Sequence, residues 1–185
     1  MKAITLLIEE HNNIKRVLKI IRKLCLKILN QDLIDYESFY DAIKFVRNYA
    51  DQHHHNKEEE ILFERMKQEL DQDLITDPIM GMFSEHDLGR LFISNLEKAL
   101  IDVKDGNDDA KVDIIANAIS YTDLLYRHID KEDNAIYTFA EKNLPQEILA
   151  EVEKECEKVE KKAYKKDLQQ NYIELIDKLE KRLES

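Results

Sequence analysis

Hydrophobic positions in the first three quarters of the chain recur every three or four residues, which is the period of an amphipathic helix. One such helix is predicted from about Ala3 to Asn30, and a second from a cap near Asp35 to about Leu70. A third is expected to begin at Asp77-Pro78 and to end near Lys104, and a fourth to span Ala110 to Lys142. Four helices joined by short loops predict an all-α fold, an up-down-up-down four-helix bundle.

The chain changes character after Asn143-Leu144-Pro145, which breaks the fourth helix. Residues 146–183 are highly charged and have a narrower apolar stripe, which slips by one residue between Ala163 and Leu168. One or two helices with a kink at this point are therefore expected. The pattern predicts a metal-binding bundle over residues 1–144 and a charged C-terminal helical extension over residues 145–185. The extension can cover the bundle, pair with a second copy in a homodimer, or bind a partner protein.

Composition supports the all-α prediction and excludes some partners. The 185 residues include only 3 glycines and 2 prolines, too few for the tight turns of sheets, and 36% are charged. A net charge of -11 argues against nucleic acid, whose phosphates require a basic surface. No apolar run reaches the roughly 18 residues that a membrane span needs, and the N-terminus is amphipathic rather than signal-like. We therefore expect no membrane partner and a cytoplasmic location.

The six histidines fall into a pattern that occurs twice. Each half of the chain has a Glu-His pair and, at a nearly equal separation, a His-x-x-x-Glu. The first half contains Glu10-His11 and then His54 and Glu58, and the second contains Glu85-His86 and then His128 and Glu132. Residues i and i+4 of a helix lie on one face, so each His-x-x-x-Glu can direct both side chains at one point in the core.

A duplicated set of imidazoles and carboxylates predicts one metal site between two similar helical hairpins. The candidate ligands are His11, His54, Glu58, His86, His128 and Glu132, with the two glutamates as bridges between two ions. Imidazole and carboxylate ligands suit iron, manganese or zinc. Six protein donors leave room on two ions for solvent, oxide or a small molecule.

The exact register is ambiguous because three histidines and three glutamates are adjacent in the first half. Aligning the halves on Lys57 and Lys131 pairs His54 with His128 and Glu58 with Glu132. His55 with Glu59 is the competing pair, and Asp133 competes with Glu132. His53 is expected to be exposed, and the alternative is a donor that hydrogen-bonds to a ligand from outside the site.

These motifs resemble those of hemerythrin-like proteins of the HHE cation-binding type, over about residues 1–144. The resemblance rests on Glu10-His11, on the run from His54 to Phe63, on the run from Glu85 to Arg90, and on the run from His128 to Asp133. It implies a hemerythrin-like bundle around a non-haem di-iron centre with an oxo or hydroxo bridge. It also implies the same six ligands and reaction with dioxygen, peroxide or nitric oxide.

The chain departs from the oxygen-carrying members of that family, which have a further histidine one turn along the third helix. Met82 and Arg90 occupy the corresponding positions here. This departure predicts a spare coordination position on the ion bound by His86 and His128, and peroxide chemistry in place of reversible oxygen transport. Gly89 is expected to leave space beside His86. Tyr121, two turns before His128, is positioned to hydrogen-bond a bound species.

Two functions from different classes follow. The first is a di-iron protein that binds or reacts with a small oxidant under oxidative or nitrosative stress. The second is a sensor of oxygen, iron or redox state, in which the metal controls how the C-terminal helix packs, without turnover. Sustained consumption of oxidant distinguishes the first from the second.

Overall fold

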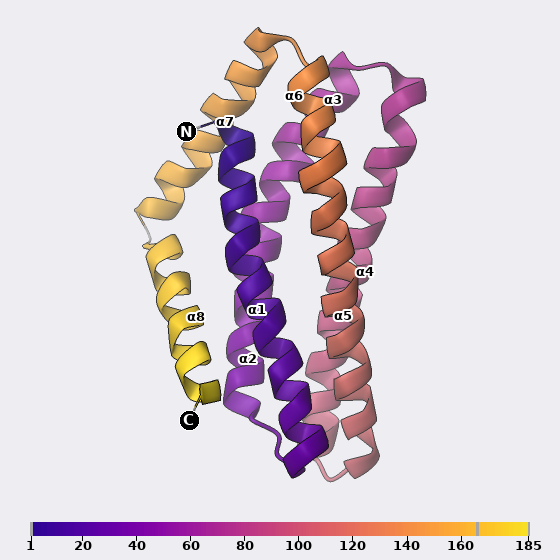
Figure 1. Ribbon diagram of the computed structural model, residues 1–185, viewed down its shortest axis with the longest axis vertical. Helices are drawn as coiled ribbons and strands as arrows, with labels where there is room; N and C mark the ends of the chain where they lie inside the picture. The colour runs from indigo at the N-terminus through magenta and orange to yellow at the C-terminus, as the bar shows by residue number, and fades with distance from the viewer. Residues whose placement is uncertain (1, 166, 185) are drawn as a thin grey trace.

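The computed structural model describes residues 2–165 and 167–184, and this part of the chain contains helices and no strand. The first bundle helix is α1 (Ala3–Gln31), and the third is α4 (Gln72–Lys104). The second is a continuous rod of α2 (Tyr36–Phe45), η1 (Val46–His55), η2 (Glu58–Leu62) and α3 (Phe63–Glu69). The fourth begins after the 3-10 turn η3 (Asp108–Ala110) and consists of α5 (Lys111–Lys131), η4 (Glu132–Ile136) and α6 (Tyr137–Asn143). Consecutive rods run in opposite directions, which confirms the predicted bundle (Figure 1).

The third helix begins five residues earlier than expected. It starts at Gln72 and not at Asp77-Pro78, because Asp71 caps it by accepting a hydrogen bond from the Asp73 backbone N–H at 3.0 Å. Pro78 therefore lies inside α4. A proline inside a helix removes one backbone hydrogen bond, and near the beginning of a long helix the remaining turns tolerate that loss.

The core of the bundle consists of two apolar clusters. The cluster at the end shared by the α1–α2 turn and the α4–α5 loop is the larger, and includes Leu18, Phe39, Leu100 and Leu125. The other surrounds the start of α1 and includes Leu7, Phe63, Ile79 and Tyr137. Where the two clusters adjoin, each bundle helix has at least one buried histidine, and all of them except α4 also have a buried glutamate. A buried polar layer thus separates the two clusters.

The C-terminal extension forms α7 (Gln146–Tyr164) and α8 (Leu168–Glu184), with the expected break between Ala163 and Leu168. Both helices lie along α1 (Figure 1). Arg16 of α1 contacts Asp177 of α8 at 2.6 Å, and Ile176 is fully buried against the bundle. The apolar stripe of the extension is therefore used within the chain.

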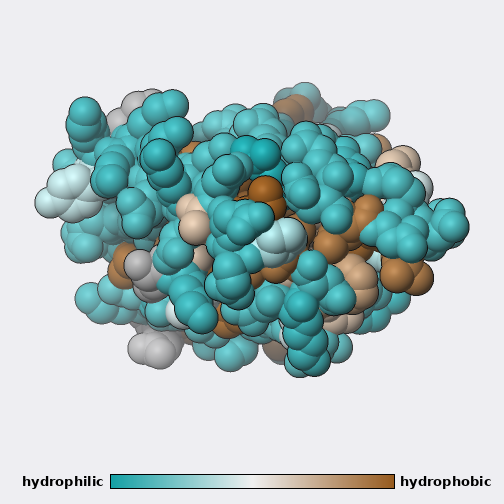
Figure 2. All heavy atoms as spheres, turned by 90° about the horizontal axis from the view of Figure 1, so that it is seen from above, coloured by the Kyte–Doolittle hydropathy of each residue, from teal (hydrophilic) through white to brown (hydrophobic). Residues whose placement is uncertain are grey.

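The two cysteines are free and buried, Cys25 in α1 and Cys156 in α7, as their positions on apolar stripes predict. Hydrophilic side chains dominate the surface at the end of the bundle where α6, α7 and α3 meet, with scattered apolar ones between them (Figure 2). Among the described helices, none combines the length and the apolar character that crossing a membrane requires.

Candidate metal centre

Seven buried side chains converge in the polar layer and form two adjacent groups. The first group is His11, His54, Glu58 and Glu132, and the second is His55, His86 and His128. Within each group, one potential ligand atom per residue lies within 4.8 Å of the others. The structure thus brings together all six candidate ligands from the sequence and adds His55.

Four of the imidazoles face one another in pairs. The Nε2 atoms of His11 and His54 are 2.9 Å apart, and those of His86 and His128 are also 2.9 Å apart. A neutral imidazole has one protonated nitrogen and one lone pair, so the state of each Nε2 depends on what the other ring nitrogen contacts.

Each of these four rings has a carboxylate at its outer nitrogen. The Nδ1 atoms lie 2.7–2.9 Å from a carboxylate oxygen, in the pairs His11–Asp133, His54–Glu10, His86–Glu59 and His128–Glu85. A carboxylate only accepts, so each Nδ1–H donates, and the Nε2 lone pairs point inward. Carboxylates at the outer nitrogen orient histidine ligands toward a metal ion in this way.

The outer contacts repeat the symmetry of the sequence. The glutamate before each lone histidine, Glu10 or Glu85, accepts from the later histidine of the same half. The acid that follows each bridging candidate accepts from the first histidine of the other half. Glu59, after Glu58, accepts from His86, and Asp133, after Glu132, accepts from His11. The duplication therefore extends beyond the converging residues to the groups that orient them.

Glu58 and Glu132 lie between the two imidazole pairs. Glu58 Oε2 is 3.6 Å from Nε2 of both His54 and His86. The oxygens of Glu132 lie 3.4 Å from His11 Nε2 and 3.1 Å from His128 Nε2. Each carboxylate thus reaches one imidazole of each pair, which is the position of a bridge between two ions.

Several buried oxygens in this layer have no hydrogen-bond partner among the described residues. They are Oε2 of Glu58 and both oxygens of Glu132. The other oxygen of Glu58 accepts from the Tyr137 hydroxyl. Unsatisfied buried carboxylate oxygens are costly. Inward lone pairs beside such oxygens match a pair of cations, so the residues present fit two metal ions.

The ionisation of the layer also favours bound cations. Burial and the charge of Glu132 raise the pKa of Glu58 well above its ordinary value. Burial lowers the pKa of His11, but its hydrogen bond with Asp133 and the nearby carboxylate of Glu132 outweigh this effect and raise it. Burial and the neighbouring His11 lower the pKa of His54 to about 4. A bound metal ion would therefore compete with protons at Glu58 and His11, where the pKa is raised.

His55 is the converging residue that the repeat argument left out. Its ring stacks on that of His86, with centroids 3.8 Å apart and an interplanar angle of 12°. His55 lies at the end of η1, a π-helical segment with i→i+5 hydrogen bonds, a conformation frequent at functional sites. The wider turn allows both His54 and His55 to face the layer, which an ideal α-helix disfavours. The run His53-His54-His55 was the feature of the sequence that could have identified His55 as a candidate ligand.

The prediction that His53 is exposed is wrong. Only 5% of its surface is accessible, and its Nε2 lies 3.1 Å from both Glu10 and Glu160. Burial follows from α7, which covers this side of the bundle and contributes Glu160. The competing acids Glu59 and Asp133 lie outside the convergence and accept from ligand candidates.

The prediction of a spare coordination position on the ion bound by His86 and His128 rested on a missing third histidine, and His55 supplies that histidine. These two rings have a third imidazole beside them, supplied by the second bundle helix in place of the third. The end of the layer with fewer imidazoles is the one formed by His11 and His54. Arg90 faces acids rather than the layer, with Nε 2.8 Å from Asp51 and a second nitrogen 2.8 Å from Glu59.

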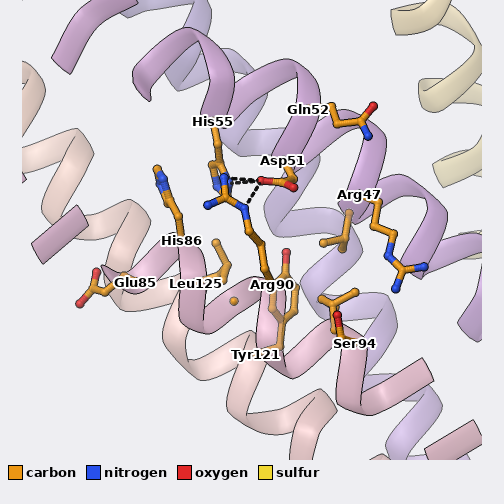
Figure 3. Close-up of a pocket in the computed structure, with 13 residues that line it drawn as sticks. Arg47, Asp51, Gln52, His55, Glu85, His86, Arg90, Ser94, Tyr121 and Leu125 are labelled. Atoms are coloured by element: carbon orange, nitrogen blue, oxygen red, sulfur yellow. Dashed lines mark hydrogen bonds and ion pairs between the residues drawn. The ribbon is translucent and has the colours of Figure 1, made fainter. Parts of the chain in front are cut away.

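A cavity of about 270 Å³ extends outward from His55 and His86. Figure 3 shows Asp51 next to His55 and Arg90, with Tyr121 below Arg90 in this view. The Tyr121 hydroxyl is buried, and no described residue hydrogen-bonds to it.

Gly89 lines the same cavity, and we expect Gly89→Ala to stabilise the protein. An added Cβ would lie 3.5 Å from Leu125 and 3.6 Å from Tyr121, which is ordinary contact, so close helix packing does not require glycine here. Alanine inside a helix is favoured over glycine by about 1 kcal/mol. Chemical denaturation checks this gain. An equal loss of stability would show that the helices are packed more tightly at this point.

The fold and the layer together define a helical-bundle protein with buried histidine–carboxylate groups that could hold metal ions. The family model for the hemerythrin HHE cation-binding domain matches residues 2–140, and the chain belongs to that family. Comparison with curated proteins and with solved structures gave no match. The match ends before α7, so it does not cover the C-terminal extension.

Proposed function

We propose that this protein holds two non-haem iron ions and binds or reduces a small oxidant, namely dioxygen, peroxide or nitric oxide. His55, His86 and His128 would hold one ion, His11 and His54 the other, and Glu58 and Glu132 would bridge them. Manganese and zinc can use the same donors. Bound iron would supply electrons and Lewis acidity.

The protein residues would position the ligands, shield the layer from water and admit a small molecule. Outer carboxylates fix four imidazole rings, and the Tyr137 hydroxyl fixes one oxygen of Glu58. The two apolar clusters on either side exclude bulk water from the layer. The cavity at His55 and His86 gives a small molecule an approach to the layer, past the unpartnered hydroxyl of Tyr121.

One observation supports this proposal above all others. Four imidazoles present their lone pairs to two buried carboxylates that have unsatisfied oxygens. A structural cluster of hydrogen bonds would instead satisfy these atoms internally.

Protein purified from iron-replete cells should contain two iron ions per chain, measured by elemental analysis. Its reduced form should consume peroxide or nitric oxide over many turnovers when an electron donor is supplied. The matched control is His86→Ala, which keeps the fold's surface intact and removes one candidate ligand. Zinc as the only bound metal, or consumption unchanged in His86→Ala, would contradict the proposal.

A second candidate is a sensor in which the metal state alters the packing of the C-terminal helices. The contact of Glu160 in α7 with the polar residues around Glu10 favours it. A partner or second copy would then bind the outer side of α7 and α8, since their apolar stripe faces α1. Oxidant binding without sustained consumption would identify this function.

A further inference from the structure

The two halves of the site are alike at the inner residues but differ in how their outer lysines are surrounded. Lys57 donates to Glu10, and Lys131 donates to Glu85, at equivalent places in the repeat. Lys131 is about half exposed, with 49% of its side chain accessible. Lys57 is buried, with 0% of its side chain accessible.

The C-terminal extension causes this difference. Glu160 of α7 accepts a hydrogen bond from Lys57 Nζ at 2.6 Å and lies 3.1 Å from His53 Nε2. Gln169 at the start of α8 donates to the second oxygen of Glu160 at 2.6 Å. The second half of the repeat has no counterpart among these contacts, because none of the described helices covers Lys131, which is 49% exposed.

These contacts connect Glu160, through Lys57 and Glu10, to the candidate metal ligand His54. Glu10 accepts from Lys57 through Oε1, which also lies 3.1 Å from His53 Nε2, and from His54 Nδ1 through Oε2 at 2.8 Å. These contacts compete for the electron density of one carboxylate. A lysine whose charge is shared with a second carboxylate draws less density from Glu10, so Glu10 remains a strong acceptor for His54.

We propose that Glu160 is a positioning residue for the metal site, through Lys57 and Glu10 to His54, so that α7 completes the His11–His54 end of the centre. This inference rests on the proposed metal pair. It extends the functional unit beyond the matched domain, which ends at residue 140. It also gives the two ions different dependence on the extension, since the polar contacts described for His55, His86 and His128 are all with bundle residues.

Glu160→Gln tests this role by removing the charge while keeping the side-chain size. Lys57 would then be paired with Glu10 alone, and His54 would be held by a weaker acceptor. We expect the dissociation constant of one iron(II) ion to rise about tenfold, the lower end of what loss of an outer partner costs a metal site. The other ion should bind unchanged. Anaerobic iron(II) titration against a competing chelator measures both constants.

The affected ion is identified with His11→Ala, which should abolish the same binding step. Glu155→Gln is the matched control, because Glu155 is also in α7 but pairs with Arg65 at 3.0 Å, away from this network. Glu160→Asp retains the charge and should recover part of the lost affinity. A purely structural role for Glu160 would lower thermal stability without separating the two binding constants.

Coupling between two sites is reciprocal, so iron should in turn hold α7 more firmly. Iron(II) loading should slow amide hydrogen exchange around Glu160 in the wild-type chain, and this protection should disappear in Glu160→Gln. If the wild type binds two ions and Glu160→Gln binds both with unchanged constants, the positioning role is wrong and the proposed function stands. If the wild type takes up no pair of ions, the proposed function itself fails, and this inference fails with it.

Discussion

Removal of the metal is expected to lower the melting temperature by roughly 6–12 °C, which corresponds to about 3 kcal/mol for a chain of this size. The physical reason is the polar layer. Without cations, Oε2 of Glu58 and both oxygens of Glu132 have no hydrogen-bond partner among the described residues, and protons must occupy the space between the paired imidazoles. Thermal unfolding before and after dialysis against a chelator measures the change, and hydrogen exchange should rise first near His54 and His128.

Two features of this result are specific to the metal. Iron added back should restore the melting temperature, because a ligand at 100 times its Kd contributes about 2.7 kcal/mol. The same chelator should leave the melting temperature of Glu132→Ala unchanged, since that variant is expected to hold no metal. Equal melting temperatures with and without metal would contradict the assignment of the layer as a metal site.

Glu132→Ala should abolish binding of both ions, the largest effect expected of any single substitution. Glu132 faces one imidazole of each pair, with its oxygens 3.4 Å from His11 Nε2 and 3.1 Å from His128 Nε2. The change should therefore exceed the 10–100-fold cost of losing an outer partner. Metal content should fall from two ions per chain to nearly none, by elemental analysis after desalting.

Comparison with two other variants distinguishes a shared bridge from an ordinary ligand. His11→Ala should lose one ion only, because His11 belongs to one of the two groups. Glu141→Ala removes an exposed glutamate from α6, the next segment of the same rod, and should retain both ions. One ion retained in Glu132→Ala would show that Glu132 serves a single ion.

The sequence by itself determined the bundle and most of the candidate site. Apolar residues at helical spacing specify which side of each helix is buried, so the four rods followed from periodicity alone. The repeat of Glu-His and His-x-x-x-Glu identified six candidate ligands, and all six converge in the structure. They are His11, His54, Glu58, His86, His128 and Glu132. Helical spacing is a local property, which is why a sequence can reveal it.

Only the tertiary structure decided what depends on contacts between distant segments or on departures from ideal helix geometry. The π-helical segment η1 directs both His54 and His55 inward, whereas the α-helical period separates adjacent side chains. The burial of His53 and Lys57 depends on α7, whose Glu160 contacts both residues although it lies 103 residues after Lys57. No local pattern encodes which helix covers which half of a symmetric site, and here that choice makes the two halves unequal.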